Sequence, residues 1–361
     1  MTPRPGTSTF SGWFAGPKAE NGDRFAHILQ RIVQDYYSWR RNYFPEDGVV
    51  IDSAAKRAAE PFHDAFEDRL TELLGRLKND FPFHSPRYAA HMLSEQTLPS
   101  IAGLFAGMLY NPNNVSFESA PVTVRLEVEA AQMIARMLGY GPSCWAHLTG
   151  GGTVANLEAL WVARTVRYLP MVIRDMRRAV GLPAPAWPDG PRGCLRLSPS
   201  ETLRALAECF REAEETLGAG PETTQRLIRA YLDSPFCIVE RGAAAVFEAV
   251  GSSPVLVVPE THHYCFEKAL DVLGLGRRAL ARVRVDSDFR MMTDDLASVL
   301  DRIEDEGRHP LAVVAVVGST EEGAIDPLNE ILDLRARREA AGLGSFWVHA
   351  DAAYRGGTCG R

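Results

Sequence analysis

An aspartate stands at the end of a short apolar run near the end of the sequence. The run covers residues 346–348, and Asp351 follows it after one histidine and one alanine. In an open α/β sheet, ligands bind outside the carboxyl ends of the strands. A carboxylate in the middle of a strand would be buried without a partner, at a high cost in free energy. We therefore expect Asp351 to face a ligand, which can be a ribose hydroxyl, a metal ion or a protonated ring nitrogen.

A glycine-rich turn opens a helix well upstream of this aspartate. The sequence reads TGGGTVAN over residues 149–156 and continues in the helical pattern LEALWVAR. Such a turn exposes backbone N–H groups at the positive end of a helix, which favours an anion such as phosphate. Glycine lets the backbone approach a phosphate closely, and Thr153 can add its hydroxyl. A turn with a purely structural role explains this pattern equally well when it is taken alone.

Two further apolar runs are followed by polar residues. PETHH follows the run at 255–258, and GSTEEG follows the run that ends at 317. One polar strand end is common, because loops begin there. Three of them, together with a turn of the phosphate-binding type, predict a single site at the carboxyl edge of one sheet.

Strands and helices alternate in the C-terminal part of the sequence. The apolar runs cover residues 236–239, 255–258, 311–317 and 346–348, and helical patterns cover 122–139, 266–273, 293–306 and 327–341. This alternation predicts an α/β fold with a mainly parallel sheet. Residues 170–235 are interpreted as connecting helices or an insertion.

Two amphipathic helices are predicted ahead of the first strand, at 23–41 and 53–78. Two such helices cannot bury their apolar stripes fully on each other. We therefore expect an N-terminal helical segment, residues 1–79, that packs on a partner subunit or on the main domain at 80–361. A helical hairpin that stands on its own is the alternative.

An irregular segment with two histidines follows these helices. Prolines break the helical pattern in FPFHSPRYAAHM, which contains His84 and His91. Histidines, an arginine and aromatic residues in such a segment suit the wall of a pocket. A surface loop followed by the start of a helix is an equal alternative.

The composition limits the class of protein. The 361 residues are 46% hydrophobic and 24% charged, as in a soluble globular protein of about two domains. The net charge of −7 disfavours a nucleic-acid partner. No apolar run reaches the ~18 residues of a membrane span, and no signal-peptide pattern begins the sequence, so we expect a cytoplasmic protein without a membrane partner. The six cysteines form no CxxC pair, and we predict no metal site.

The spacing of these features separates the candidate ligands of Asp351. A dinucleotide site needs its acid about 20 residues after the glycine turn, and Asp351 lies far beyond that distance. His349 and Asp351 can supply two metal ligands, but positions i and i+2 share a face in any strand. Pyridoxal phosphate needs a phosphate cup, an acid for its ring nitrogen, a flat group to stack on the ring, and a lysine. The first three have candidates here.

Four ordered segments resemble the group II pyridoxal-phosphate-dependent amino acid decarboxylases. They are TGGGTVAN at 149–156, ETHHY at 260–264, VGSTEEGA at 317–324 and HADAAY at 349–354. The stretches VANLEALWVAR and VVGSTEEGAIDP are similar to bacterial tyrosine decarboxylases in particular. The resemblance runs from about residue 80 to 361. It implies a fold-type I, aspartate-aminotransferase-like large domain and a homodimer.

The resemblance also implies which residues hold the cofactor. Gly151, Gly152 and Thr153 would cradle its phosphate. Asp351 would pair with the ring nitrogen and keep it protonated, because an adjacent carboxylate favours the charged form. The protonated ring then accepts the electron pair that decarboxylation leaves on the substrate.

Five further residues receive roles from the same resemblance. His263 would stack on the ring and act as the catalytic residue, because a histidine can move a proton near neutral pH. Ala353 would pack on the opposite face of the ring, and Thr320 would lie near the ring or its substituents. His91 would line the substrate pocket, and His84 is a weaker candidate for the same wall. A structural histidine at a strand end is the alternative for His263.

We therefore expect a lyase that converts an L-amino acid to its amine and CO₂, with tyrosine or phenylalanine as the substrate. Glutamate stays open as a substrate because Arg87 can bind a distal carboxylate. Another reaction of fold-type I enzymes, such as that of a different lyase or an aldolase, is the alternative within enzymes. These reactions share the cofactor site and differ in their contacts with the substrate.

Two departures from the family pattern bear on this expectation. The family has His-Val-Asp where this sequence has His-Ala-Asp, and its Schiff-base lysine lies beyond that acid. The four lysines here are Lys18, Lys56, Lys78 and Lys268. None follows Asp351, so we expect the chain to be the N-terminal part of the enzyme and inactive alone. A separate polypeptide can carry the remainder. A non-catalytic relative that serves as a partner subunit is the alternative from another class.

Overall fold

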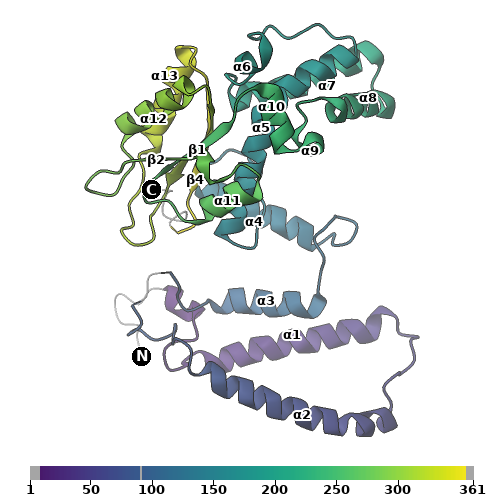
Figure 1. The fold of residues 1–361 in the computed structure, drawn as a ribbon. Helices are drawn as coiled ribbons and strands as arrows, with labels where there is room; N and C mark the ends of the chain where they lie inside the picture. The colour runs from purple at the N-terminus through teal and green to yellow at the C-terminus, as the bar shows by residue number, and fades with distance from the viewer. Residues whose placement is uncertain (1–8, 90–91, 355–361) are drawn as a thin grey trace. The chain divides into compact units, whose positions relative to one another are not determined.

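A computed structural model of the chain describes residues 9–89 and 92–354 (Figure 1). The chain divides into two compact units, residues 1–129 and residues 130–361. The boundary predicted between residues 79 and 80 concerns where the cofactor-binding domain begins. The division into compact units does not show where that domain begins, so this boundary stays a prediction.

The first unit is helical. Its elements are the short helix η1 (Thr9–Trp13), α1 (Gly22–Tyr43), α2 (Ser53–Leu77), α3 (Leu98–Tyr110) and the beginning of α4 (Thr123–Met137). These elements confirm the helices predicted at 23–41, 53–78 and 122–139. α2 begins at Asp52, whose carboxylate accepts hydrogen bonds from two backbone N–H groups of the first turn. α1 packs against α3, with the rings of Tyr36 and Tyr110 in an edge-to-face contact at 5.1 Å.

The apolar stripe of α2 is not covered within this unit. No residue of α2 is buried, and Phe62 and Phe66 are 68% and 54% exposed. Leu70, Leu73, Leu74 and Leu77 continue the stripe and are also exposed. The expectation that two such helices do not bury their stripes on each other is therefore confirmed.

The second unit contains a parallel sheet. Its strands are β1 (Pro254–Pro259), β2 (Leu280–Val283), β3 (His309–Val316) and β4 (Trp347–Asp351). Their spatial order is β2-β1-β3-β4, and every neighbouring pair is parallel. All eight residues of β3 are buried, as expected for a central strand of a sheet that is covered on both faces. The predicted α/β class with a parallel sheet is confirmed.

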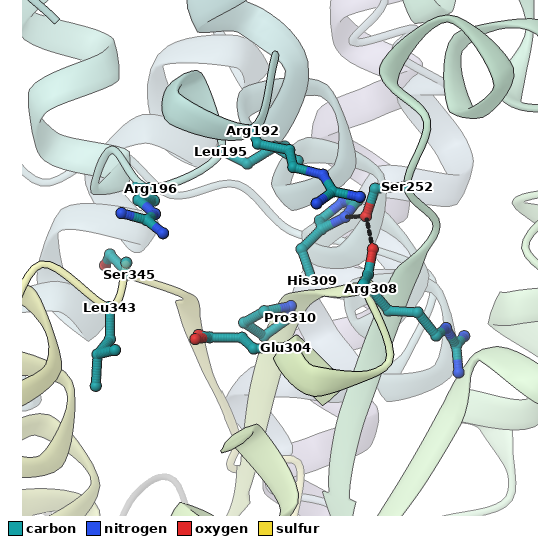
Figure 2. A pocket seen from close by; sticks show the side chains of 12 residues that line it. Arg192, Leu195, Arg196, Ser252, Glu304, Arg308, His309, Pro310, Leu343 and Ser345 are labelled. Carbon is teal, nitrogen blue, oxygen red and sulfur yellow. Dashed lines mark hydrogen bonds between the residues drawn. The ribbon is translucent and has the colours of Figure 1, made fainter. Parts of the chain in front are cut away.

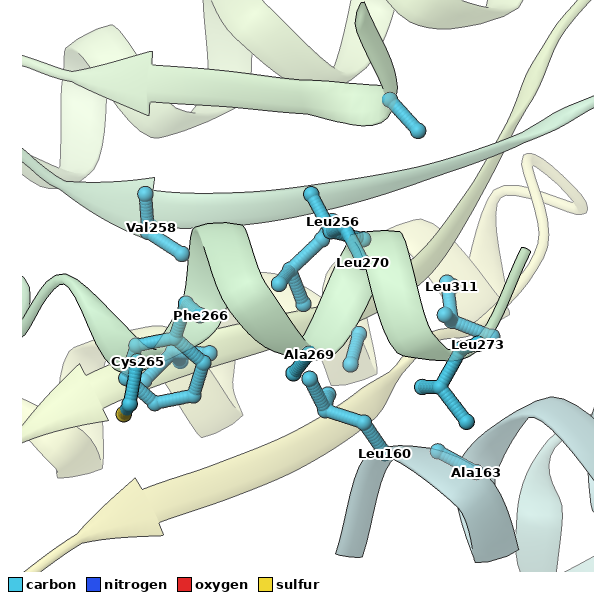
Figure 3. Close-up of a cluster of buried hydrophobic side chains, with 13 residues drawn as sticks. Leu160, Ala163, Leu256, Val258, Cys265, Phe266, Ala269, Leu270, Leu273 and Leu311 are labelled. Atoms are coloured by element: carbon cyan, nitrogen blue, oxygen red, sulfur yellow. The ribbon is translucent and has the colours of Figure 1, made fainter. Parts of the chain in front are cut away.

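Helices cover both faces of this sheet. On one face, α5 (Gly152–Ala179) and α11 (Cys265–Val272) contribute to an apolar cluster with the strands (Figure 3). On the other face, α12 (Thr293–Asp305) and α13 (Leu328–Ala340) pack with Val255, Val257, Val313 and Phe346. Alternate residues of β1 enter the two clusters, which is the period of two that a strand imposes. The helices predicted at 266–273, 293–306 and 327–341 are confirmed.

A helical layer follows α5 and packs on its C-terminal half. It consists of α6 (Gly190–Cys194), α7 (Pro199–Leu217), α8 (Pro221–Asp233), α9 (Ile238–Arg241) and α10 (Ala243–Val250). The predicted connecting helices are thus confirmed, but the strand predicted at 236–239 is wrong, because α9 begins there. Its Ile238 is buried against Tyr168 and Val246 in a cluster built by helices. Periodicity alone does not separate a short apolar run in a helix from a strand.

The strand β2 is missing from the sequence-based expectation. Its four residues include Arg282, and only Val283 is buried. β2 lies at the edge of the sheet beside β1, where an arginine is tolerated. Within residues 9–89 and 92–354, no helix is long and apolar enough to cross a membrane.

Candidate active site

The three polar strand ends lie along one edge of the sheet. β1, β3 and β4 are consecutive neighbours in space, so the loops that follow Pro259, Val316 and Asp351 leave the same edge. Val316 pairs with Asp351 in the register of β3 and β4, and the next N–H group, that of Val317, donates to the Asp351 carbonyl at 2.8 Å. The structure therefore brings together the loops in which His263 and Thr320 lie and the strand end that carries Asp351.

The glycine-rich turn meets the same edge. Gly151 is the N-terminal cap of α5 and has a φ of +133°, a value that favours glycine. A Cβ atom added to Gly152 would lie 3.0 Å from the Cβ atom of Ala353, just past the end of β4. A side chain at position 152 would thus push the helix away from the strand. The first N–H groups of a helix lack intrahelical acceptors, so this turn presents donors beside the end of β4.

A buried asparagine joins three elements of the site. Asn156, on α5, donates from Nδ2 to the Asp351 Oδ2 atom at 3.0 Å and to the Cys265 Sγ atom at 3.3 Å. The Asn156 Oδ1 atom lies 2.7 Å from Nε2 of His349 on β4. Both Asn156 and Asp351 are buried, at 4% and 8% exposure. Sequence reasoning assigned no role to Asn156, although the stretch VANLEALWVAR contains it.

The hydrogen-bond pattern indicates how the Asn156 amide is oriented and which ring nitrogen of His349 carries a proton. The carboxylate of Asp351 only accepts hydrogen bonds when it is ionised, so the Asn156 amide nitrogen must face it. The Asn156 oxygen then accepts from His349, which carries its proton on Nε2. Burial lowers the pKa of His349, and the nearby Asp351 opposes this shift. A neutral His349 is the state in which burial and hydrogen bonding agree.

The buried carboxylate of Asp351 lacks a cationic partner. Its Oδ1 atom accepts from the Ala353 N–H at 3.3 Å, and Oδ2 accepts from Asn156. No lysine, arginine or protonated histidine in the described part of the chain forms an ion pair with it. Burying an anion costs several kcal/mol unless it is paired. A protonated ring nitrogen would supply that pairing, so this donor set fits the pyridine ring of pyridoxal phosphate.

His263 lies at the other end of the contact chain. The Cys265 N–H donates to Nδ1 of His263 at 3.2 Å, which leaves the proton of a neutral ring on Nε2. The His263 side chain is exposed, and its ring lies 4.2 Å from that of Tyr264. Cys265 also contacts Asn156, so a series of contacts runs from His263 through Cys265 and Asn156 to Asp351. The N–H group and one face of the His263 ring can contact a flat ligand.

The remaining polar residues at this edge differ in burial and in hydrogen bonding. Thr320 is half-buried in the loop after β3. The hydroxyl of Thr261 is buried and has no hydrogen-bond partner in the described residues. His262 donates from Nδ1 to the Pro259 carbonyl at 2.7 Å, and burial lowers its pKa. His262 therefore serves the loop, whereas the Thr261 hydroxyl leaves hydrogen-bonding capacity for a ligand.

The predicted substrate-binding histidines, His84 and His91, precede the unit that carries this edge in the sequence. His84 is exposed in a turn of the first unit. His91 lies outside the described residues, and so do the glycines at 356 and 357 that follow the HADAAY segment. No metal-binding group of three or more histidine, cysteine or acidic side chains occurs in residues 9–89 and 92–354. The substrate-binding roles of both histidines stay predictions.

Comparison with solved structures identifies the fold. The chain is similar to the glutamate decarboxylase domain of a diaminobutyrate-pyruvate transaminase and L-2,4-diaminobutyrate decarboxylase from Vibrio parahaemolyticus, with a TM-score of 0.54 and 18% identity. That match covers 93% of this chain and 58% of the other. It is also similar to Oryza sativa TDC, solved with PLP and tryptamine, with a TM-score of 0.51, 18% identity, and 95% and 56% coverage. The fold is that of the pyridoxal-phosphate-dependent decarboxylases.

Sequence comparison finds similarity to the same kind of enzyme. Residues 238–359 match the pyridoxal-dependent decarboxylase conserved domain. The chain is 32% identical to the L-tyrosine decarboxylase of Enterococcus faecalis over 356 residues, which are 97% of this chain and 52% of that enzyme. It is also 32% identical to the L-tyrosine decarboxylase of Levilactobacillus brevis, over 95% of this chain and 51% of that enzyme. Residues 238–359 thus carry a pyridoxal-dependent decarboxylase domain, and the chain spans about half the length of these relatives.

Proposed function

We propose that this chain forms the cofactor-binding part of a pyridoxal-phosphate-dependent amino acid decarboxylase. The observation that carries the proposal is the buried carboxylate of Asp351, which has two neutral hydrogen-bond donors and no cationic partner in the described residues. It lies beside a helix N-terminus whose glycines leave room for a phosphate. A pyridine ring that carries both a cationic nitrogen and a phosphate satisfies both features.

Different residues of the chain would bind different parts of the cofactor. Backbone N–H groups around Gly151, Gly152 and Thr153 would hold the phosphate, and Asp351 would pair with the ring nitrogen. When bound, the cofactor accepts the electron pair that remains after the substrate carboxylate leaves as CO₂. Asn156 would keep the Asp351 carboxylate oriented through its hydrogen bond. His263 would stack on the ring and offer its Nε2–H to the substrate.

The substrate we propose is an aromatic L-amino acid, with tyrosine first. Support comes from the two L-tyrosine decarboxylases that are 32% identical over nearly the whole chain. Diaminobutyrate decarboxylation is a second candidate, because residues of this chain are 42% identical over 156 positions to the L-2,4-diaminobutyrate decarboxylase of Rhizobium meliloti. That match covers 43% of this chain and 28% of the relative. It therefore supports the shared decarboxylation chemistry more strongly than it supports diaminobutyrate as the substrate.

The test combines cofactor binding with product analysis. Pyridoxal phosphate is titrated into the protein purified together with any polypeptide that accompanies it, and amine and CO₂ are measured with tyrosine, phenylalanine, glutamate and diaminobutyrate. We expect Asp351→Asn to abolish most product formation even where cofactor binding persists, because a neutral amide does not hold the ring nitrogen protonated. Asp333→Asn is the control, since Asp333 is an exposed acid on α13 that forms no ion pair with the described residues.

The outcomes separate the candidate functions. Product from one amino acid names the substrate, and near-normal turnover by Asp351→Asn would refute the role of Asp351. Cofactor binding without product from any substrate would favour a non-catalytic partner subunit. Reduction of the bound cofactor with borohydride, followed by peptide mapping, shows whether one of the four lysines of the sequence bonds to it. Absence of cofactor binding would overturn the proposal.

We further propose that α2 mediates a homodimer. Its stripe of Phe62, Phe66, Leu70, Leu73, Leu74 and Leu77 is exposed within the first unit, and contiguous apolar surface of this kind is typical of an interface. Sedimentation measurements should give a dimer for the unchanged chain and a monomer for Phe66→Glu. A monomeric unchanged chain would contradict this assignment. Placement of the protein in the cytoplasm stays a prediction.

A further inference from the structure

A cavity opens at the edge of the sheet opposite to the candidate active site. It has a volume of about 160 Å³ and lies around the residues that precede β1, β3 and β4 (Figure 2). Ser252 stands just before β1, His309 begins β3, and Ser345 stands just before β4. β3 is eight residues long, so the two edges are separated by about 25 Å at the usual rise of a strand. The cavity is therefore distinct from the Asp351 site.

Two arginines at this cavity have unpaired guanidinium groups. Arg192, on α6, and Arg196, just after it, line the cavity. Neither guanidinium forms a hydrogen bond or ion pair with any residue in 9–89 or 92–354. Gly307 and Gly344 make room for them. A Cβ atom at Gly307 would lie 3.8 Å from an Arg192 nitrogen, and one at Gly344 would lie 3.3–3.6 Å from Arg196 atoms.

The other charged groups of the cavity are already paired. The guanidinium of Arg308 donates to the Ser253 hydroxyl at 3.2 Å and to the Pro254 carbonyl at 3.3 Å. In Figure 2 the Arg308 side chain extends away from Arg192 and Arg196. Glu304 accepts from Arg338 at 2.7 Å, in an ion pair that Arg338 shares with Asp301. The guanidinium groups of Arg192 and Arg196 are thus the lining cations that have no ion-pair or hydrogen-bond partner among the described residues.

The wall of the cavity beside Arg192 is neutral and fixed by hydrogen bonds. Ser252 donates to the Gly307 carbonyl at 2.8 Å, so its oxygen must accept from Nδ1 of His309 at 2.9 Å. The other ring nitrogen of His309 then accepts from the hydroxyl of Tyr168 at 3.0 Å. Burial lowers the pKa of His309 to about 3, which agrees with this neutral state. The histidine therefore shapes the cavity, and the charge comes from the arginines.

We propose that this cavity binds a small dianion with oxygen acceptors, either phosphate or a short dicarboxylate. Guanidinium groups bind such groups through paired N–H···O hydrogen bonds, and two arginines match two negative charges. The cavity volume of about 160 Å³ leaves room for an anion of this size. The proposal does not depend on the proposed decarboxylase function, because the cavity shares no residue with the Asp351 site.

Hydrogen exchange of the full chain tests the proposal, because it locates a bound ligand. Potassium phosphate is titrated at constant ionic strength, with potassium chloride as the balancing salt, so that screening does not change. We expect the segments containing residues 192–197 and 343–346 to become protected. A parallel titration with succinate distinguishes a dicarboxylate from phosphate. This readout separates the cavity from the N-terminus of α5, whose own protection reports the other site.

Matched variants then assign the effect to the two arginines. In Arg192→Gln with Arg196→Gln, the concentration at half-protection should rise about tenfold or more, as expected when a charge-assisted hydrogen bond is lost. The control pairs Arg226→Gln with Arg229→Gln, because both arginines are exposed on α8 and the charge change is the same. The control should bind as the unchanged chain does. Equal weakening in both pairs, or no protection of these segments by either anion, would overturn the proposal.

Discussion

Removal of Asn156 tests whether the contact chain around Asp351 is built as described. The substitution Asn156→Ala deletes the donor to Asp351 at 3.0 Å and the acceptor for His349 at 2.7 Å. Asp351 stays buried and His349 stays partly buried. Water therefore does not easily replace the hydrogen bonds that Asn156 made with them. Alanine is also smaller and favours the helix, so the substitution leaves α5 itself intact.

The expected loss follows from the two hydrogen bonds. The bond to the carboxylate is charge-assisted and contributes about 2 kcal/mol, and the neutral bond with His349 contributes about 1 kcal/mol. We therefore expect Asn156→Ala to lower the free energy of unfolding of the second unit by about 3 kcal/mol. The affinity for pyridoxal phosphate should fall as well, because Asp351 is no longer held in place.

Urea unfolding followed by hydrogen exchange of the β3 and β4 amides measures this loss in the correct unit. Thr293→Ala is the matched control, since the Thr293 hydroxyl also donates to a carboxylate, that of Glu330, at 3.0 Å. That bond is exposed, so its removal should cost less than about 1 kcal/mol. A loss for Asn156→Ala that is no larger than the loss for Thr293→Ala would refute the reasoning.

Three further predictions address other parts of the second unit. Burial lowers the pKa of His309 from 6.5 to about 3, so the unfolded chain binds more protons between these values and stability falls as the pH drops below 6.5; between pH 7 and 5 the unchanged chain should lose about 2 kcal/mol more than His309→Gln in urea titrations. Gly152→Ala should weaken cofactor binding, because its Cβ would lie 3.0 Å from that of Ala353, and adding Ala353→Gly should restore binding in the same dialysis assay. Arg338→Met should lower the melting temperature, because Arg338 is 5% exposed and binds Asp301 and Glu304; a melting temperature equal to that of the unchanged chain would contradict this account of the α12–α13 contact.

The sequence predicts the parts of the site that depend on local patterns. Asp351 follows an apolar run and the glycines begin a helical pattern, and the structure places both at one edge of the sheet. Asn156 escapes such reasoning because its role arises from a contact with a residue 195 positions away. No local sequence pattern around an asparagine in the first turns of a helix indicates that it contacts a distant carboxylate.

The same limit explains the errors in the fold. The apolar run at 236–239 is short enough to suit a strand, but α9 forms there because Ile238 finds its buried neighbours among helices. β2 is not predicted because its position at the sheet edge permits Arg282 within the strand. In both cases tertiary surroundings decide the structure, and the local sequence does not report them.

The protonation state of the bound cofactor tests the central claim most directly. Pyridoxal phosphate labelled with ¹⁵N in its ring would be bound to the unchanged chain and to Asp351→Asn, and the ¹⁵N chemical shift would be measured for each. The account predicts a protonated ring nitrogen in the unchanged chain and a neutral one in Asp351→Asn, because the buried carboxylate is the group that stabilises the cation. A neutral nitrogen in the unchanged chain, or the same shift in both proteins, would contradict it.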